Sequence, residues 1–223
     1  MGKQIKMKIS DGAEIGVYHA SAQGTRRGGL VLIQEIFGVN AHIRAVADSY
    51  AALGYEVLAP SLFDREAPGF ESDYSPNQFK EALWLAREEH PFELSIADAQ
   101  RCIDALKDKG PVFMVGYCYG GSVTWASACK CENLAAASGY YGSYIVTKLK
   151  DLTPRAPVIL HFGRTDDGIP MPDVETFMTL HADVPVYVYD AGHAFNSDRP
   201  AYHEPSAKLA LERTLELFRK YGG

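Results

Sequence analysis

The sequence contains no long apolar run and no basic cluster, and each absence excludes a class of protein. The first ten residues, MGKQIKMKIS, alternate charged and apolar side chains, so they are neither a signal peptide nor a membrane span. No Lys/Arg run is long enough to form a nucleic-acid or anionic-membrane surface, and the formal net charge of the 223 residues is −6. We therefore expect a cytoplasmic protein whose partner is a small molecule, not a nucleic acid or a membrane.

Cysteine is also scarce. The four cysteines (102, 118, 129 and 131) are too few for a disulfide framework in a chain of this length. Cys129 and Cys131 are too close together for a zinc knuckle and have no second pair of ligands nearby. Unpaired thiols in a reducing compartment are the expected state, and no metal site is predicted.

Apart from these absences, short β-like runs alternate with helical patterns, which favours one α/β domain over residues 1–223. The expected strands are 3–9, 13–19, 30–33, 55–60, 112–115, 134–138, 157–162 and 184–189, and the expected helices are 41–53, 77–90, 92–109, 119–130, 171–182 and 205–221. Long loops are expected at 61–75 and 139–156. The pattern predicts a mainly parallel, doubly wound sheet flanked by helices, with an N-terminal antiparallel hairpin. Ligands bind such sheets at the carboxyl ends of the strands.

The stretch GYCYG, Gly116 to Gly120, is the most specific motif in the chain. It has the form G-x-C-x-G, with an expected strand before it and an expected helix after it, which is the context of a nucleophile elbow. Small residues are needed on either side of a nucleophile held in a strained turn, and the helix N-terminus favours a thiolate. The alternative is a glycine-rich turn around a structural thiol. Cys118 is thus a candidate nucleophile.

Two further candidates follow later strands, in the chain order nucleophile, acid, histidine. Asp166 and Asp167 come just after the strand 157–162, and His193 follows the strand 184–189 and a glycine. A turn or helix-capping role is the alternative for Asp166, and Asp167 remains a second candidate for the acid. The other histidines (19, 42, 90, 161, 181 and 203) fit core, helix, edge or loop positions.

Glu35 ends a wholly apolar strand, where a carboxylate is costly unless it is paired or protonated. It either forms a salt bridge with a nearby arginine or lies beside Cys118 and takes the thiol proton. The next residue, Ile36, would then contribute a backbone N–H to an oxyanion hole, with the N–H of Tyr119 as the second donor.

Five blocks, QEIFGVN, LFDREAPG, GYCYGG, HFGRTDDGIP and GHAFNSDRP, resemble the dienelactone hydrolase (carboxymethylenebutenolidase) family, a branch of the α/β-hydrolase fold. They occur in matching order between residues 34 and 200. The resemblance implies a triad of Cys118, Asp166 and His193, with Glu35 helping to generate the thiolate once substrate is bound. It also implies that an ester or lactone acylates the cysteine and that no metal or organic cofactor is needed.

The resemblance is weaker at the expected substrate-binding arginines. Members that cleave dienelactone hold its carboxylate with arginines, one of them four residues after the catalytic histidine, where this chain has Ser197. Arg199 is two residues further on. A second arginine is expected between Pro68 and the next long helix, yet no arginine occurs between Arg65 and Arg87. Arg65 is the best predicted anion contact, with a structural role in its loop as the alternative. Arg199 and Tyr140 are the other predicted substrate contacts.

A cysteine-dependent ester or lactone hydrolase is therefore the leading hypothesis. The missing arginines favour an esterase or thioesterase for a neutral acyl group as the first rival. A receptor without turnover would have no need of all three triad residues, and a redox sensor would need a resolving cysteine close to Cys118. The sequence does not predict an oligomeric state.

Overall fold

The computed structural model describes residues 1–223 and is built on one eight-stranded sheet. Its strand order is β1-β2-β4-β3-β5-β6-β7-β8, in which β2 pairs antiparallel with both β1 and β4 and all other pairs are parallel. The strands are β1 (Lys3–Lys8), β2 (Glu14–Ala20), β3 (Gly28–Ile33), β4 (Tyr55–Pro60), β5 (Val112–Tyr117), β6 (Ala136–Tyr140), β7 (Val158–Gly163) and β8 (Val186–Tyr189). The predicted mainly parallel sheet with an N-terminal hairpin is confirmed.

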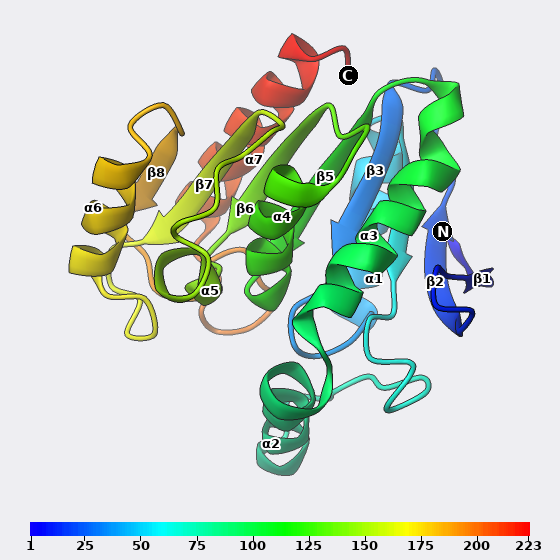
Figure 1. Ribbon diagram of the computed structural model, residues 1–223, viewed down its shortest axis with the longest axis horizontal. Coiled ribbons are helices and arrows are strands. Elements are labelled where there is room, and N and C mark those ends of the chain that lie inside the picture. Colours follow the sequence, from blue (N-terminus) through cyan, green and yellow to red (C-terminus); the bar gives the residue numbers. More distant parts are fainter.

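Helices cover both faces of this sheet. They are α1 (Ala41–Ala52), α2 (Pro76–Trp84), a π-helical turn η1 (Leu85–Glu89), α3 (Phe92–Leu106), a 3₁₀ turn η2 (Lys107–Lys109), α4 (Tyr119–Lys130), α5 (Ser143–Thr147), α6 (Met171–Leu180) and α7 (Glu204–Lys220). Figure 1 shows α3 and α4 in front of the sheet, α7 behind it, and α2 set apart from the sheet. No helix combines the length and apolar character that a membrane crossing requires.

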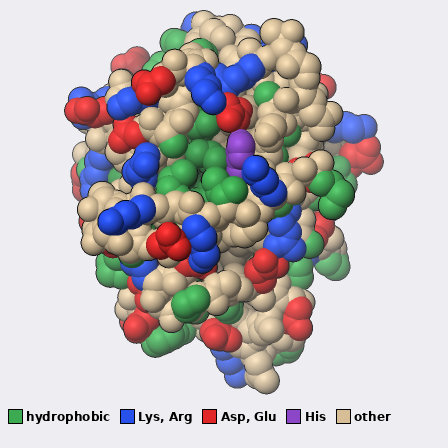
Figure 2. All heavy atoms as spheres, turned by 90° about the vertical axis from the view of Figure 1, so that its right-hand side faces the viewer, with side chains coloured by type: hydrophobic (Ala, Val, Ile, Leu, Met, Phe, Trp, Pro, Cys, Tyr) green, Lys and Arg blue, Asp and Glu red, His purple; other side chains and the backbone are tan.

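The central strands are buried on both faces, as their continuous apolar runs predict. Every residue of β3, β5 and β7 is buried, and the same holds for α4 from Tyr119 to Cys129. The carboxyl ends of β5 and β7 therefore lie in the buried core, and the end of β8 is held beside β7 by the pairing of Tyr189 with Gly163. On the face shown in Figure 2, acidic and basic side chains are interspersed, not gathered by sign.

Some expected boundaries were wrong. The strand expected at 134–138 runs instead to Tyr140, because Gly139 and Tyr140 continue the ladder to β5 and β7. The loop expected at 139–156 therefore contains the end of β6 and also the short helix α5. The helix expected at 77–90 changes at Leu85 to a π turn, closed by a hydrogen bond of 2.8 Å from the His90 N–H to the Leu85 carbonyl. Residues 61–75 contain no helix or strand, as predicted.

Candidate active site

Cys118 lies at a sharp turn between β5 and α4, in a backbone conformation that side-chain-bearing residues rarely adopt. Its φ is 54° and its ψ is −115°. The turn passes close to neighbouring backbone: a Cβ at Gly120 would lie 2.5 Å from the carbonyl oxygens of Ile33 and Gln34, and a Cβ at Gly116 would meet the carbonyl of Gly120. The small residues of the GYCYG motif are therefore a steric requirement of the turn.

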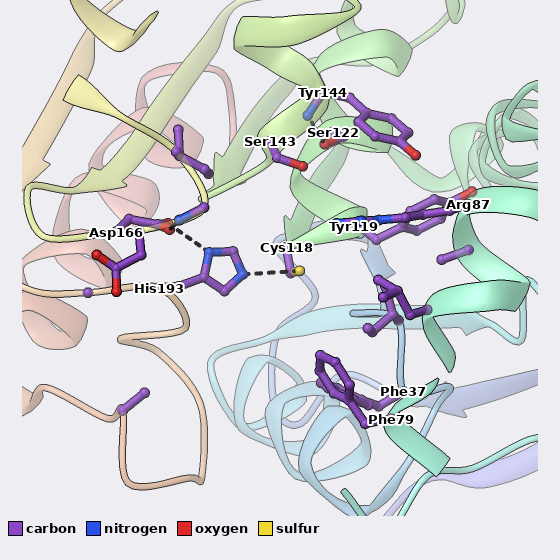
Figure 3. A pocket seen from close by; sticks show the side chains of 18 of the residues that line it. Phe37, Phe79, Arg87, Cys118, Tyr119, Ser122, Ser143, Tyr144, Asp166 and His193 are labelled. Carbon is purple, nitrogen blue, oxygen red and sulfur yellow. Dashed lines mark hydrogen bonds and ion pairs between the residues drawn. The ribbon is translucent and has the colours of Figure 1, made fainter. Parts of the chain in front are cut away.

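The turn directs Cys118 towards His193, and His193 towards Asp166 (Figure 3). The Cys118 Sγ is 3.2 Å from His193 Nε2, and His193 Nδ1 is 2.7 Å from Asp166 Oδ2. Asp166 is buried, and its Oδ1 accepts a hydrogen bond of 2.9 Å from the Gly168 N–H. Asp167 is exposed and has no contact with the imidazole. Of the two adjacent carboxylates, the structure thus pairs Asp166 with the histidine.

The two contacts of His193 decide its charge. Burial lowers the pKa of the imidazole, but the charge of Cys118 and the hydrogen bonds to Asp166 and Cys118 outweigh burial and raise the pKa to about 10. The protonated imidazole is therefore the favoured form of His193 at neutral pH. An adjacent imidazole is the group that activates the nucleophile in cysteine-dependent enzymes.

Cys118 opens into a cavity of about 490 Å³. The cavity is lined by the triad side chains and by Ile36, Phe37, Phe79, Leu83, Ala86, Arg87, Tyr119, Ser122, Ser143, Tyr144, Thr165, Asp167, Gly168, Ile169, Gly192, Arg199 and Ala201. Figure 3 shows Phe37 and Phe79 on one side of Cys118, and Ser143 and Tyr144 on the other. The N–H of Ile36 has no hydrogen-bond partner in the protein, and Tyr119 is the first residue of α4, where N–H groups point out of the helix.

Glu35 forms a salt bridge, which is one of the two roles expected for it. Its side chain is only 2 % exposed, and its two oxygens lie 2.7 and 2.8 Å from Nη2 of Arg199. The guanidinium also lies over the rings of Phe37 and Tyr74, at 4.7 and 4.9 Å from their centroids. Arg199 therefore lines the cavity with its charge already paired, and no hydrogen bond joins Glu35 to Cys118.

Arg65 and Tyr140, the other predicted substrate contacts, do not line the cavity. Arg65 is held by two hydrogen bonds of 2.7 Å to the buried carboxylate of Asp98 and by one of 2.8 Å to Asp11. The ring of Tyr140 is buried, and its hydroxyl lies 2.8 Å from Thr214 Oγ1. Both side chains are engaged within the fold, so the structure does not support their predicted role.

Arg87 is the charged lining residue that the sequence analysis did not propose as a site residue. It is exposed, it points towards the cavity (Figure 3), and it forms no salt bridge. It lies on the π turn η1, where an extra residue in the turn changes the direction of the side chains that follow. The sequence pattern predicts a helix of regular period here, and in such a helix the side chain of residue 87 would point in a different direction. Arg87 is thus the free cationic group of the cavity wall.

The sheet order and its helical crossovers define the α/β-hydrolase fold, with Cys118 at the turn after its central strand. Within this class, the chain belongs to the dienelactone hydrolase family, whose model matches residues 15–222.

Relatives agree with this assignment. A Salmonella typhimurium protein, named provisionally as a carboxymethylenebutenolidase, is 34% identical over 96% of this chain and 86% of its own. The carboxymethylenebutenolidase of Pseudomonas putida is 28% identical over 96% and 94% of the two chains. A Klebsiella pneumoniae crystal structure, named provisionally as a dienelactone hydrolase, is 30% identical, with a TM-score of 0.82 over 99% of this chain and 100% of that one.

Proposed function

We propose that the protein hydrolyses a carboxylic ester or lactone with Cys118 as the nucleophile, His193 as the acid and base, and Asp166 as the residue that orients the imidazole. The observation that carries the proposal is the continuous contact from Sγ through the imidazole to the buried carboxylate, 3.2 and 2.7 Å long, at the wall of a cavity large enough for a small ester.

The reaction then follows from the charges of the pair. The Cys118 thiolate attacks the carbonyl carbon, and the N–H groups of Ile36 and Tyr119 stabilise the oxyanion. His193 gives its proton to the leaving alkoxide as the thioester forms. The neutral imidazole then removes a proton from water, the resulting hydroxide attacks the thioester, and the acid is released as Cys118 returns to the thiolate.

In this cycle His193, and not Glu35, accepts the proton of the thiol. The imidazole Nε2 is within hydrogen-bonding reach of Sγ, whereas both oxygens of Glu35 are held by Arg199. Glu35 and Arg199 instead fix the strand end that carries Ile36, the first oxyanion donor.

A dienelactone-type substrate, a small unsaturated lactone with a free carboxylate, is the favoured substrate class. The cavity combines apolar side chains such as Phe37 and Phe79 with one unpaired guanidinium, Arg87. Arg87 would hold the carboxylate while the apolar wall holds the ring. The alternative is an ester or thioester of a neutral acyl group, and the observation favouring it is that Arg199 is already neutralised by Glu35.

Steady-state kinetics on a dienelactone and on a neutral 4-nitrophenyl ester test both the proposed nucleophile and the proposed substrate class. Cys118→Ala should abolish turnover of every substrate, whereas Cys129→Ala, which removes a buried thiol outside the cavity, should not. Arg87→Gln should lower kcat/KM for the dienelactone by about tenfold or more and leave the neutral ester unaffected, and Arg87→Lys should restore part of the loss. Equal effects of Arg87→Gln on both substrates would support the neutral-acyl alternative. Turnover that survives in Cys118→Ala would contradict the mechanism.

A further inference from the structure

A chain of three hydrogen bonds, two of them fully buried, lies outside the proposed triad and ends on Tyr119, the residue after the proposed nucleophile. Glu66 Oε2 lies 3.0 Å from His90 Nδ1, His90 Nε2 lies 3.0 Å from Ser95 Oγ, and Ser95 Oγ lies 2.9 Å from the Tyr119 hydroxyl. His90 is 4% exposed and Ser95 is fully buried. The four residues come from the loop before α2, the joint between η1 and α3, α3 itself, and the start of α4. The chain therefore joins four separate parts of the fold.

With a neutral imidazole, the donor and acceptor of each hydrogen bond in this chain of contacts are determined. A carboxylate only accepts hydrogen bonds, so His90 Nδ1 donates to Glu66 and Nε2 accepts from the Ser95 hydroxyl. The Ser95 oxygen is then free to accept from the Tyr119 hydroxyl. Each group is satisfied by its neighbours, which fixes the orientation of the Tyr119 ring in the cavity wall.

Carboxylate, imidazole and serine follow one another here as in a serine hydrolase, but Ser95 is not a second nucleophile. Its side chain has no exposed surface and does not line the cavity. Its oxygen also has a partner on each side, His90 and Tyr119. An ester bound in the cavity therefore does not meet the Ser95 hydroxyl, and the chain acts by holding other groups in place.

The same chain closes the base of the segment that forms the outer wall of the cavity. This segment consists of α2 and η1, residues 76–89, and is called the α2–η1 wall below. Four of its residues line the cavity: Phe79, Leu83, Ala86 and Arg87. Glu66 lies in the loop ten residues before the start of α2 and His90 directly follows η1, so their contact ties together the chain on either side of this segment. Figure 1 shows α2 lying away from the sheet, so the attachments at its base decide where the wall stands.

We propose that His90 is a positioning residue for substrate binding. Through Glu66 it fixes the α2–η1 wall, and through Ser95 it fixes the Tyr119 ring, so that the cavity keeps the width that an acyl group larger than acetyl requires. The inference rests on the proposed function, because it assigns these residues to the cavity in which the ester binds. Loss of the chain should weaken the binding of a bulky acyl group and leave the chemistry at Cys118 intact.

The test compares 4-nitrophenyl acetate with 4-nitrophenyl phenylacetate in the wild type, His90→Phe, Ser95→Ala and the double variant. Phe keeps a ring at position 90, where the imidazole centroid lies 5.3 Å from that of Phe63. KM for the phenylacetate ester should rise by about fivefold in either single variant, which is the effect of one buried hydrogen bond. KM for the acetate and kcat for both esters should stay within about twofold. The double variant should be no worse than the worse single one, because both changes break one chain.

The matched control is Ser206→Ala. Ser206 is a buried serine whose Oγ lies 2.7 Å from His203 Nδ1, and it does not line the cavity. It should change neither KM. An unchanged KM for the phenylacetate ester in both single variants would overturn the proposal. Equal losses with both esters would do the same, since they would indicate general destabilisation.

A calorimetric titration with phenylacetate keeps the inference separable from the proposed function. In the Cys118→Ala background the dissociation constant of this product acid should rise by about fivefold when His90→Phe is added. If the wild type shows no Cys118-dependent turnover but this shift is found, the hydrolase proposal fails and the positioning role stands. If turnover is found but neither KM nor the dissociation constant shifts, only the positioning role fails.

Discussion

At the scale of single residues, the charge of His193 has a measurable consequence. The contacts with Cys118 and Asp166 raise its pKa to about 10, so the protonated imidazole that acylation requires persists through neutral pH and is lost as the pH rises through about 10. We expect kcat/KM for an alkyl ester such as ethyl acetate, whose alkoxide needs that proton to leave, to fall on the alkaline side between about pH 6 and pH 11 with a midpoint near this value.

Asp166→Asn should move that midpoint to lower pH, because one of the groups that raise the pKa of His193 has lost its charge. It should also lower kcat by about 10²- to 10⁴-fold, since an amide no longer fixes the tautomer of the imidazole. Asp167→Asn, an exposed neighbour without the contact, is the matched control and should change neither quantity. An alkaline limb that does not move in Asp166→Asn would contradict the assigned role.

The sequence predicts some features of the site and not others, for physical reasons. The tight turn that holds Cys118 could be predicted because its steric demands appear directly as glycines in the sequence. Asp166 and Asp167 could not be separated, because adjacent residues after a strand differ only in the direction of their side chains. Arg199 reaches Glu35 across 164 positions through a bend of its loop, and no local pattern records such a contact.

At the scale of elements, the turn between β5 and α4 leaves no space for a side chain at Gly120. The Cβ of alanine there would lie 2.5 Å from the carbonyl oxygens of Ile33 and Gln34. Gly120→Ala should therefore lower the free energy of unfolding by about 1–3 kcal/mol and abolish most esterase activity, because the strand end that carries Ile36 must shift. Urea unfolding and steady-state kinetics measure the two effects.

Gly24→Ala is the control for this substitution. Gly24 has a φ of 71°, but no atom lies within 4 Å of the point that a Cβ would occupy. Alanine there should cost about 1–2 kcal/mol through its backbone conformation alone and leave the kinetics unchanged. Full activity in Gly120→Ala would show that the turn tolerates a methyl group.

The boundaries of helices and strands were predictable where the hydrophobic pattern and the glycine or proline residues indicate the same end point. Where the two disagree, the predicted boundary was wrong. The buried strands β3 and β5 are evident as apolar runs. The end of β6 was missed because Gly139-Tyr140-Tyr141-Gly142 has the composition of a turn, yet Gly139 is required for close packing: a Cβ there would lie 3.0 Å from Leu160 and 3.1 Å from the Gly121 carbonyl. The π turn of η1 depends on tertiary contacts, so the orientation of Arg87 could not be predicted.

At the scale of the whole molecule, a buried histidine links stability to pH. His161 on β7 is fully buried between Ser138, at 3.0 Å, and the Tyr189 hydroxyl, at 2.8 Å. Burial and the nearby charge of Arg213 lower its pKa to about 3. Between that value and its ordinary value of 6.5 the unfolded chain binds a proton that the folded chain does not, so stability falls as the pH falls through this window.

The expected contribution of His161 is a loss of about 2 kcal/mol between pH 7 and pH 5. Urea unfolding of the wild type and of His161→Gln at both pH values isolates it, because the other titrating groups are common to the two proteins. The difference between the two pH values should be smaller in the variant by that amount. An identical difference in both would mean that the histidine does not govern this part of the acid response.

The separation of the three proposed catalytic side chains along the chain has a consequence for synthesis. Cys118 leaves the ribosome 48 positions before Asp166 and 75 before His193, the residue at hydrogen-bonding distance from its sulfur. During that interval the nascent chain carries an ordinary thiol without a base beside it. The reactive form arises only when β7 and β8 have joined the sheet, so unfinished chains do not carry an activated nucleophile.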